Sequence, residues 1–472
     1  MNGGRHISSL KFSIRSFSTS SLVSIRPAPA WNNSSNQENK LNNYSGPLAI
    51  INNLLETASS KFGKKPSLTQ KHQYKASTSP SGIPLSKFFS VKFPLPIMES
   101  FQDYKKRNQL LNIQDDLLTL LDMENLENLN MSVLKVPIHL DKEGRVIKIK
   151  DVMTDGTMRD ADNYINEVCI SPKNIDPQDK SVKHLILIHG YGAGLGFYIK
   201  NLEKMAEFIN QEITKGSSKW CIHAIDLLGY GSSSRPKINY KTNNSLQTFE
   251  DWFVDSLENW RIQRQLNHYE NNLVIAHSMG AYLSVCYNIK YPKTFRKLVL
   301  VSPAGMIKPA TFDSKRIPGW FNYLWNKNVS PFALVRYSGP LGSFFVSGWT
   351  SRRFANLTHR EHALLHRYSY GIFNARGSGE YFLNYVLSAG GVPRYPLVKN
   401  KTRLKQVSCE TEWLYGDNDW MDSRGGLIAT KFLTENNKLK AKVKIFEGCG
   451  HHIYLDDITG FNNYLLSQMK EF

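Results

Sequence analysis

The strongest constraint on the fold is a strand–turn–helix pattern at residues 273–283, LVIAHSMGAYL. An apolar run predicts a buried strand, and a second apolar segment opens a helix directly after it. Ser278 falls at the turn between them, where a sharp reversal would lift its hydroxyl clear of the sheet. Ala276 and Gly280 flank it two residues away on either side, and their small size lets strand and helix approach each other. We therefore predict a nucleophile elbow with Ser278 as the nucleophile; the alternative is an ordinary strand–helix turn.

The strand patterns along the chain predict a mostly parallel α/β sheet. Alternating apolar and polar residues indicate half-buried strands that form an antiparallel edge. Continuous apolar runs separated by helical patterns indicate strands that are buried on both faces. The alternating segments are residues 132–140, 146–150 and 164–170, and the continuous runs are residues 184–189, 220–225, 273–276, 298–301, 412–415 and 443–446.

A serine nucleophile needs a base and an acid that orients the base. His451 follows the last predicted strand in the sequence GCGHHI, and the small residue before it suits a tight loop. The neighbouring His452 would point the other way in an extended loop. For the acid, YGDNDWMD offers Asp419, three residues after the glycine that ends a strand, while Asp417 and Asp422 are better explained as turn caps. The order Ser278, Asp419, His451 is the one expected of α/β-hydrolases.

A glycine-rich loop, HGYGAG at residues 189–194, is the candidate oxyanion hole. Its glycines allow backbone N–H groups to approach a ligand closely. We predict that the amides of Tyr191 and Met279 donate to the oxyanion. The alternative, a phosphate-binding loop, rests on the glycines alone and is weaker beside a nucleophile elbow. Asp226, in a second turn sequence DLLGYGSSSRP, is predicted to cap a turn and not to be catalytic.

Residues 306–408 separate two predicted strands and are too many for a loop, so we predict a lid. Apolar and cationic surface above an acyl-transfer site suits long acyl chains with anionic headgroups. The alternative is that the aromatic residues form the lid's own core. Nucleic acid would fit the charge but not the triad, and we do not expect it as a partner. The aromatic residues include Trp320, Phe321, Tyr323, Trp325, Phe332, Phe344, Phe345 and Trp349. The basic residues include Arg316, Arg336, Arg352, Arg353, Arg360, Arg367 and Arg376, whereas the acidic residues are only Asp313, Glu361 and Glu380.

The spacing from His451 to Asp456, His-x4-Asp, also occurs in glycerolipid acyltransferases. This motif would make His451 and Asp456 the acyltransferase pair. The alternative is that Asp456 or Asp457 caps the helix predicted to run to Met469.

The N-terminal third divides by composition. Residues 1–37 hold Arg5, Lys11, Arg15 and Arg26 and no acidic residue, which is typical of a mitochondrial transit peptide. Residues 38–130 form an extension with predicted short helices at 48–58 and 110–123 and a linker at 67–90, and the catalytic domain is predicted to span 131–472. The net charge of +19 favours anionic partners. The sequence contains no uninterrupted apolar window of 18 residues, so we do not expect a membrane-spanning helix. Five dispersed cysteines indicate a reducing compartment with buried thiols.

Five motifs in order resemble the α/β-hydrolase-domain family of lipase coactivators and lysophosphatidic-acid acyltransferases, and among them the fungal mitochondrial cardiolipin-specific deacylases and their paralogues. They are HGYGAGLG, DLLGYGSSSRP, HSMGAY, YGDNDWMD and GHHIYLD. The resemblance implies an α/β-hydrolase fold: an eight-stranded sheet, helices on both faces, and the lid between strands 6 and 7.

The same resemblance implies a function. The expected reaction is removal of an acyl chain from cardiolipin or a related anionic phospholipid, by a protein bound peripherally on the matrix side of the mitochondrial inner membrane. Ser278 is present, whereas the coactivators have lost this serine, so hydrolysis is favoured. An acyl-CoA-dependent lysophospholipid acyltransferase and a non-catalytic lipase regulator are the alternatives. We expect no metal ion and no cofactor.

Overall fold

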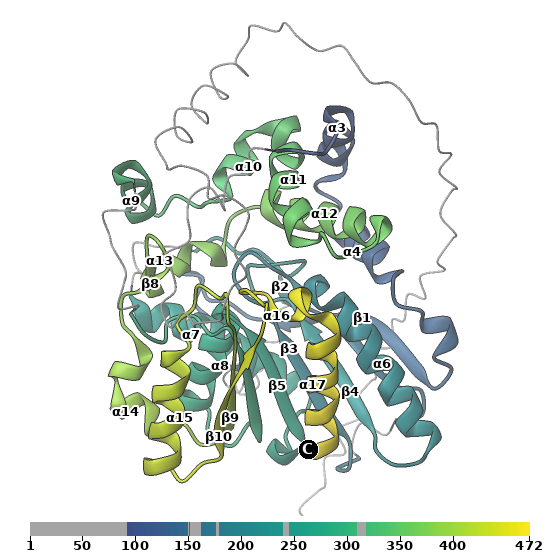
Figure 1. The fold of residues 1–472 in the computed structure, drawn as a ribbon, viewed down its shortest axis with the longest axis vertical. Helices are drawn as coiled ribbons and strands as arrows, with labels where there is room; N and C mark the ends of the chain where they lie inside the picture. Colours follow the sequence, from purple (N-terminus) through teal and green to yellow (C-terminus); the bar gives the residue numbers. More distant parts are fainter. Residues whose placement is uncertain (1–91, 150, 152–161, 176–178, 239–244, 309–317) are drawn as a thin grey trace, which may run out of the picture. The chain divides into compact units, whose positions relative to one another are not determined.

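An eight-stranded sheet organises the described part of the chain, which in this computed structural model comprises residues 92–149, 151, 162–175, 179–238, 245–308 and 318–472 (Figure 1). All of these residues belong to one unit, Pro66–Phe472. The predicted transit peptide at 1–37, the helix at 48–58, the linker at 67–90, Asp313 and Arg316 lie outside the described residues.

The sheet has the order β1-β2-β4-β3-β5-β6-β9-β10. Strands β1 and β2 form the predicted antiparallel edge, and every pairing from β4 to β10 is parallel. The mostly parallel eight-stranded sheet expected from the sequence is therefore confirmed. The strands are β1 (Leu129–Ile138), β2 (Asn163–Pro172), β3 (Lys183–Ile188), β4 (Trp220–Ile225), β5 (Asn272–His277), β6 (Lys297–Val301), β9 (Glu410–Gly416) and β10 (Ala441–Phe446).

Helices cover both faces of the sheet because the central strands carry apolar side chains on both faces. In β3, Ile186 and Ile188 point into one core cluster, while Leu185 and Leu187 point into the other. Helices α7 (Leu246–Gln263), α8 (Met279–Lys290) and α15 (Arg424–Asn436) cover the first face. Helices α6 (Ile199–Thr214) and α17 (Ile458–Glu471) cover the second.

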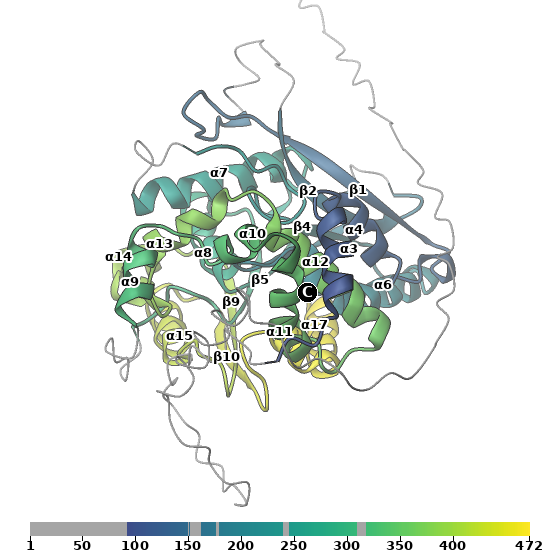
Figure 2. The ribbon, with the colours of Figure 1, turned by 90° about the horizontal axis from the view of Figure 1, so that it is seen from above.

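The lid connects β6 to β9, the sixth and seventh strands of the main sheet, as predicted. Its described residues form helices and a two-stranded ribbon, and all of these elements except the last helix, which lies beside α15, are at the end of the sheet where the parallel strands finish (Figures 1 and 2). Its elements are α9 (Gly319–Asn326), α10 (Ala333–Tyr337), α11 (Gly342–Arg353), α12 (His359–Asn374), α13 (Leu383–Val386), β7 (Leu387–Ser388), β8 (Val392–Pro393) and α14 (Lys401–Leu404).

Two helices before the sheet, α3 (Ile97–Lys106) and α4 (Leu110–Leu118), pack against the lid and the core. The buried Asp103 carboxylate accepts a hydrogen bond from Ser343 of α11 at 2.6 Å. The buried Gln114 of α4 accepts one from Asn166 of β2 at 2.9 Å. The predicted boundary at residue 131 therefore cuts through a packed unit that begins no later than α3.

The strand predicted at residues 146–150 is wrong over residues 146–149, and residue 150 lies outside the described residues. Val146 forms a single bridge to Leu140, and no strand continues from it within the described residues. The reason is competition from α7: Asn259 donates to Ile147 O at 2.7 Å and accepts from Ile149 N–H at 2.9 Å. These backbone groups are thus satisfied by a helix side chain in place of a neighbouring strand.

Candidate active site

Ser278 occupies the turn between β5 and α8 in a backbone conformation that L-residues rarely adopt, with φ 53° and ψ −113°. Its N–H donates to Val301 O at 2.9 Å, and its carbonyl accepts from Tyr282 and Ala304 N–H, each at 3.1 Å. These bonds to the helix and to the adjoining strand hold the strained turn. A Cβ on Gly280 would lie 2.4 Å from His189 O, which explains the small residue there.

The three residues predicted as a triad come together. His451 Nε2 lies 3.0 Å from Ser278 Oγ, and His451 Nδ1 lies 3.0 Å from Asp419 Oδ1. Asp419 Oδ1 also accepts from Met421 N–H at 2.9 Å, which fixes the carboxylate. A carboxylate only accepts, so Nδ1 carries the proton and Nε2 is left to accept the serine hydroxyl. This arrangement can move a proton from the serine oxygen to the imidazole.

The competing residues have other partners. Asp422 binds its neighbour Arg424 and accepts that residue's N–H at 3.0 Å, as a turn cap does. Asp417 accepts from the side chain of Asn418 at 2.9 Å. The ring of His452 lies between those of His277 and Phe197, with centroids 4.8 Å and 6.4 Å away. The sequence-based preference for Asp419 and His451 therefore agrees with the geometry.

The glycine-rich loop lies directly against the nucleophile. A Cβ on Gly190 would lie 2.9 Å from Ser278 Cβ, so glycine is required there. His189 Nε2 accepts from Leu227 N–H at 3.0 Å, and its Nδ1 therefore donates to Gly190 O at 2.7 Å. This buried ring braces the loop. The use of the Tyr191 and Met279 amides as oxyanion donors stays a prediction.

Asp226 is a structural cap, as the turn sequence predicted. Its carboxylate accepts from the N–H groups of Leu195 and Ser232, each at 2.7 Å, and from Asn166 at 2.8 Å. It therefore ties the second turn to the glycine-rich loop.

His277, next to the nucleophile, has a role that the sequence analysis missed. Its Nε2 donates to His451 O at 2.9 Å, and its Nδ1 lies 3.5 Å from the hydroxyl of Tyr454. The two imidazoles of His277 and His451 lie 4.7 Å apart. Burial, followed by the charge of His451, holds the pKa of His277 well below its ordinary value, so the ring stays neutral. The sequence signal for this role was the position of the histidine directly before the predicted nucleophile.

Buried neutral histidines predict an acid-sensitive fold. Burial and the charge of Arg353 hold the pKa of His452 well below its ordinary value, as burial does for His277. Below about pH 6.5 the unfolded chain binds protons on these rings that the folded protein does not bind. The free energy of unfolding should therefore fall as the pH drops from about 6.5 to 5, by about 1.4 kcal/mol per pH unit for each ring. Urea unfolding at pH 7.5 and pH 5.5 measures this, and equal midpoints would contradict it.

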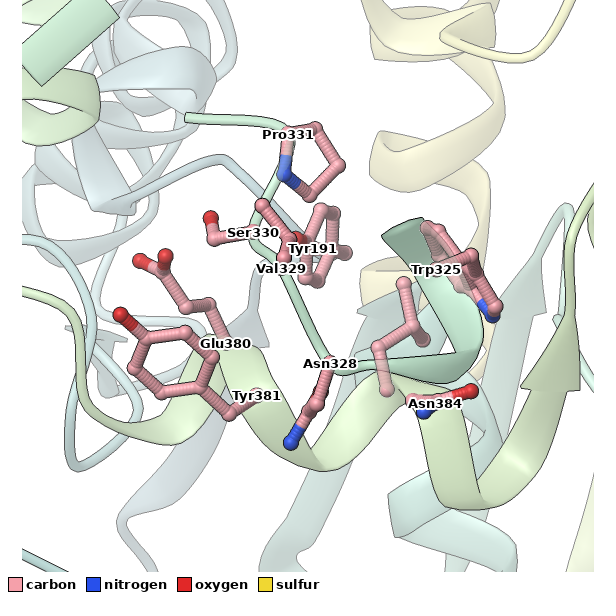
Figure 3. Close-up of a pocket in the computed structure, with 10 residues that line it drawn as sticks. Tyr191, Trp325, Asn328, Val329, Ser330, Pro331, Glu380, Tyr381 and Asn384 are labelled. Atoms are coloured by element: carbon pink, nitrogen blue, oxygen red, sulfur yellow. The ribbon is translucent and has the colours of Figure 1, made fainter. Parts of the chain in front are cut away.

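The lid covers the site. Ser278 is 6% exposed. The ring of Tyr191 stacks on Phe332 of the lid with centroids 5.4 Å apart, and a Cβ on Gly192 would lie 2.7 Å from the same phenylalanine. A pocket of only about 10 Å³ remains between Tyr191 and lid residues such as Trp325 and Glu380 (Figure 3). It is far smaller than the ~300–1,000 Å³ of ordinary ligand sites, so entry of a long acyl chain there requires movement of the lid.

One group of metal-ligand types lies away from the triad. Ligand atoms of Glu167, Cys169 and His223 lie within 4.8 Å of one another, and all three residues are buried. Arg264 donates to Glu167 and to Cys169, and His223 donates to Glu167 at 2.7 Å. Burial alone would raise the pKa of Glu167, but His223 and Arg264 outweigh it and lower that pKa. A protein cation thus already neutralises the carboxylate.

Comparisons with known proteins agree with this architecture. The family described as alpha/beta hydrolase fold matches residues 183–458, more than half of the chain. A 1-acylglycerol-3-phosphate O-acyltransferase of Arabidopsis thaliana is 32% identical over 323 residues, which cover 66% of this chain and 70% of the relative. A (lyso)-N-acylphosphatidylethanolamine lipase of Mus musculus is 28% identical over 299 residues, 61% of this chain and 79% of the relative.

Among solved structures, the naproxen esterase of Bacillus subtilis aligns with a TM-score of 0.47 and 13% identity, covering 76% of this chain and 96% of the esterase. The match to the family and the similarity to the plant acyltransferase together identify the chain. It belongs to the alpha/beta hydrolase fold family, within the group of lipase coactivators and lysophosphatidic-acid acyltransferases.

Proposed function

We propose that this protein is a serine phospholipid acyl hydrolase that removes a fatty acyl chain from cardiolipin or a related anionic phospholipid. The observation that carries the proposal is the hydrogen-bonded line from Asp419 through His451 to Ser278, with 3.0 Å at each step. A lipid-modifying hydrolase also agrees with relatives that are named as a lipase and as acyltransferases.

The reaction follows from these atoms. Ser278 Oγ attacks the ester carbonyl carbon while His451 Nε2 takes the hydroxyl proton. The Tyr191 and Met279 amides stabilise the oxyanion of the tetrahedral intermediate. The C–O bond to the lysolipid then breaks, and His451 returns the proton to the leaving alcohol oxygen. Water, deprotonated by His451, attacks the acyl-serine, and collapse releases the fatty acid and restores Ser278.

The lid and α3 favour a membrane surface as the place of reaction. Large apolar side chains are exposed on α3, α9 and α10, which lie at the same end of the unit (Figures 1 and 2). We call this set the lid face: Ile97, Met98, Phe101, Trp320, Tyr323, Leu324, Leu334 and Tyr337. Exposed Lys105, Lys106 and Lys327 accompany it. Apolar side chains with basic neighbours suit the interface of an anionic bilayer.

Peripheral attachment at the matrix side of the mitochondrial inner membrane is part of the proposal. It is supported by the transit-like composition of residues 1–37 and by five free, buried cysteines, which suit a reducing compartment. Within the described part of the chain, none of the helices has both the length and the apolar character needed to cross a bilayer. Import of a tagged full-length chain into isolated mitochondria, followed by carbonate extraction, tests the location; a protein that stays outside would refute it.

Loss of two lid-face anchors should weaken membrane binding. Met98→Glu with Tyr323→Glu removes apolar anchors and adds negative charge, so the dissociation constant for cardiolipin-containing vesicles should rise about tenfold or more. Co-sedimentation measures it. The control is Leu427→Glu, which changes an apolar side chain on α15 that is 54% exposed. An equal effect of the control would contradict a specific lid face.

A second candidate function is acyl-CoA-dependent acylation of a lysophospholipid. It is favoured by the 32% identity to the plant acyltransferase and by the His451–Asp456 spacing. Incubation of purified protein with cardiolipin vesicles, with and without lysophospholipid and acyl-CoA, separates the two. Fatty acid released without an acyl donor supports the hydrolase. Lipid acylation that survives Ser278→Ala and is lost in Asp456→Ala would support the acyltransferase instead.

A further inference from the structure

Asp456 connects the lid to the loop that carries the catalytic histidine. One carboxylate oxygen, Oδ2, accepts from Gly450 N–H at 2.8 Å, and Gly450 directly precedes His451. The other oxygen, Oδ1, forms an ion pair with the guanidinium of Arg353. Arg353 is the last residue of α11, in the lid. A single side chain thus joins the lid to the residue before the base.

The same loop has a second anchor on its other side. His277 Nε2 donates to His451 O at 2.9 Å, while Asp456 holds Gly450 N–H. The His451 backbone is therefore fixed on both sides of its Cα. A misplacement of about 1 Å in a catalytic group can cost about 10²-fold in rate, so these anchors bear directly on the Ser278–His451 distance.

Asp456 makes neither of the contacts considered from the sequence. Asp457, not Asp456, caps α17 through Gly460 N–H at 2.9 Å. Asp456 does not hold the imidazole either, because His451 Nδ1 is bonded to Asp419 Oδ1 at 3.0 Å. The carboxylate that completes the His-x4-Asp motif is thus engaged with backbone and with the lid.

The ion pair is sheltered enough to matter. The side chains of Arg353 and Asp456 are only 16% and 21% exposed. Arg353 Nε is buried and has no hydrogen-bond partner among the described residues. Removal of one charge leaves the other uncompensated in a largely buried place, and this costs far more free energy than the loss of an exposed ion pair.

We propose that Asp456 is a positioning residue for His451 and that Arg353 makes this positioning depend on a seated lid. The inference rests on the proposed function and deepens it. Entry of an acyl chain must displace the lid, and displacement of α11 separates Arg353 from Asp456. The Asp456 carboxylate is then no longer held by Arg353, so the loop of the base loses the support of the lid until the lid returns over the bound substrate. Full activity of the triad is thereby restricted to the closed enzyme.

The test uses the full-length protein and a soluble ester, p-nitrophenyl butyrate, which has no headgroup. Asp456→Asn keeps an oxygen for Gly450 N–H but loses the ion pair, and Arg353→Gln loses it from the other side. Each should lower kcat about tenfold with KM within about twofold, and the double variant should lose about tenfold, because both act through one pair. Covalent modification of Ser278 by a fluorophosphonate should slow by the same factor. Arg353→Lys, which keeps the charge, should recover most of the rate.

The matched control is Lys200→Gln. It breaks another ion pair between the core and the lid, Lys200 to Glu361 at 2.9 Å, which does not touch the catalytic loop. This variant should retain its kcat. Equal losses in the control, multiplied losses in the double variant, or a loss limited to KM for anionic phospholipids would each overturn the proposal. Thermal unfolding of every variant identifies any that does not fold. If Asp456→Asn or Arg353→Gln does not fold, the kcat of Arg353→Lys, which keeps the charge, decides the proposal. Retained activity in Ser278→Ala would refute the proposed function itself.

Discussion

Replacement of Ser278 by alanine is expected to lower kcat for ester hydrolysis by about 10⁶. The variant removes the hydroxyl oxygen that lies 3.0 Å from His451 Nε2 and leaves the base without a proton to accept. The glycine-rich loop and the lid are untouched, so lipid binding should persist. The measurement is fatty acid release from cardiolipin vesicles, with p-nitrophenyl butyrate as a second substrate. Ser284→Ala is the control, because the Ser284 hydroxyl bonds Gly280 O inside α8, and its activity should be unchanged.

The strained turn adds a stability signature to this prediction. Alanine at position 278 must keep the φ of 53°, so the free energy of unfolding should stay near the wild-type value. Glycine adopts positive φ without penalty, and Ser278→Gly should be more stable by about 1–3 kcal/mol while also inactive. Urea unfolding measures both. Hydrolysis that survives in both variants would refute Ser278 as the nucleophile, whereas a wild-type protein without any hydrolysis would favour the non-catalytic regulator.

The triad was predictable because each member follows a strand that its own short apolar run is enough to predict. Ser278 lies between an apolar run and a helix, and Asp419 follows the glycine that ends β9. His451 follows β10. The carboxyl ends of parallel strands meet at one edge of a sheet, so three loops distant in sequence had to converge there. The antiparallel edge was predictable for the same local reason, apart from residues 146–150.

The contacts made by the lid were not predictable from local patterns. The pairing of Arg353 with Asp456 joins residues 103 positions apart, and that of Ser343 with Asp103 joins residues 240 apart. Nothing in the composition of α11 indicates which of its arginines meets a carboxylate. The sequence also does not show which lid aromatics are packed inside and which are exposed. Phe332 stacks on Tyr191, whereas Trp320 is 58% exposed.

Replacement of Asp419 by asparagine should lower kcat by about 10⁴, the second largest effect. Asp419 Oδ1 accepts from both His451 and Met421 N–H, so the amide oxygen must take that place. The NH₂ group then falls at Oδ2, which is buried and has no partner among the described residues. The imidazole would keep its tautomer but lose the negative charge that stabilises it when it is protonated. The loss therefore belongs to kcat, and KM for a soluble ester should change little.

The expected loss of kcat in Asp419→Asn can be compared with that of two other Asp→Asn variants near the site. Asp417→Asn alters an exposed carboxylate that accepts a hydrogen bond from the side chain of Asn418, and its kcat should stay within about twofold. Asp456→Asn should fall between the two, about tenfold, because it acts through the loop and not through the imidazole. The ranking separates the hypotheses for the reaction. A hydrolase that uses the triad is most sensitive at Asp419, whereas an acyltransferase that uses the His-x4-Asp pair would be most sensitive at Asp456 and would tolerate Asp419→Asn.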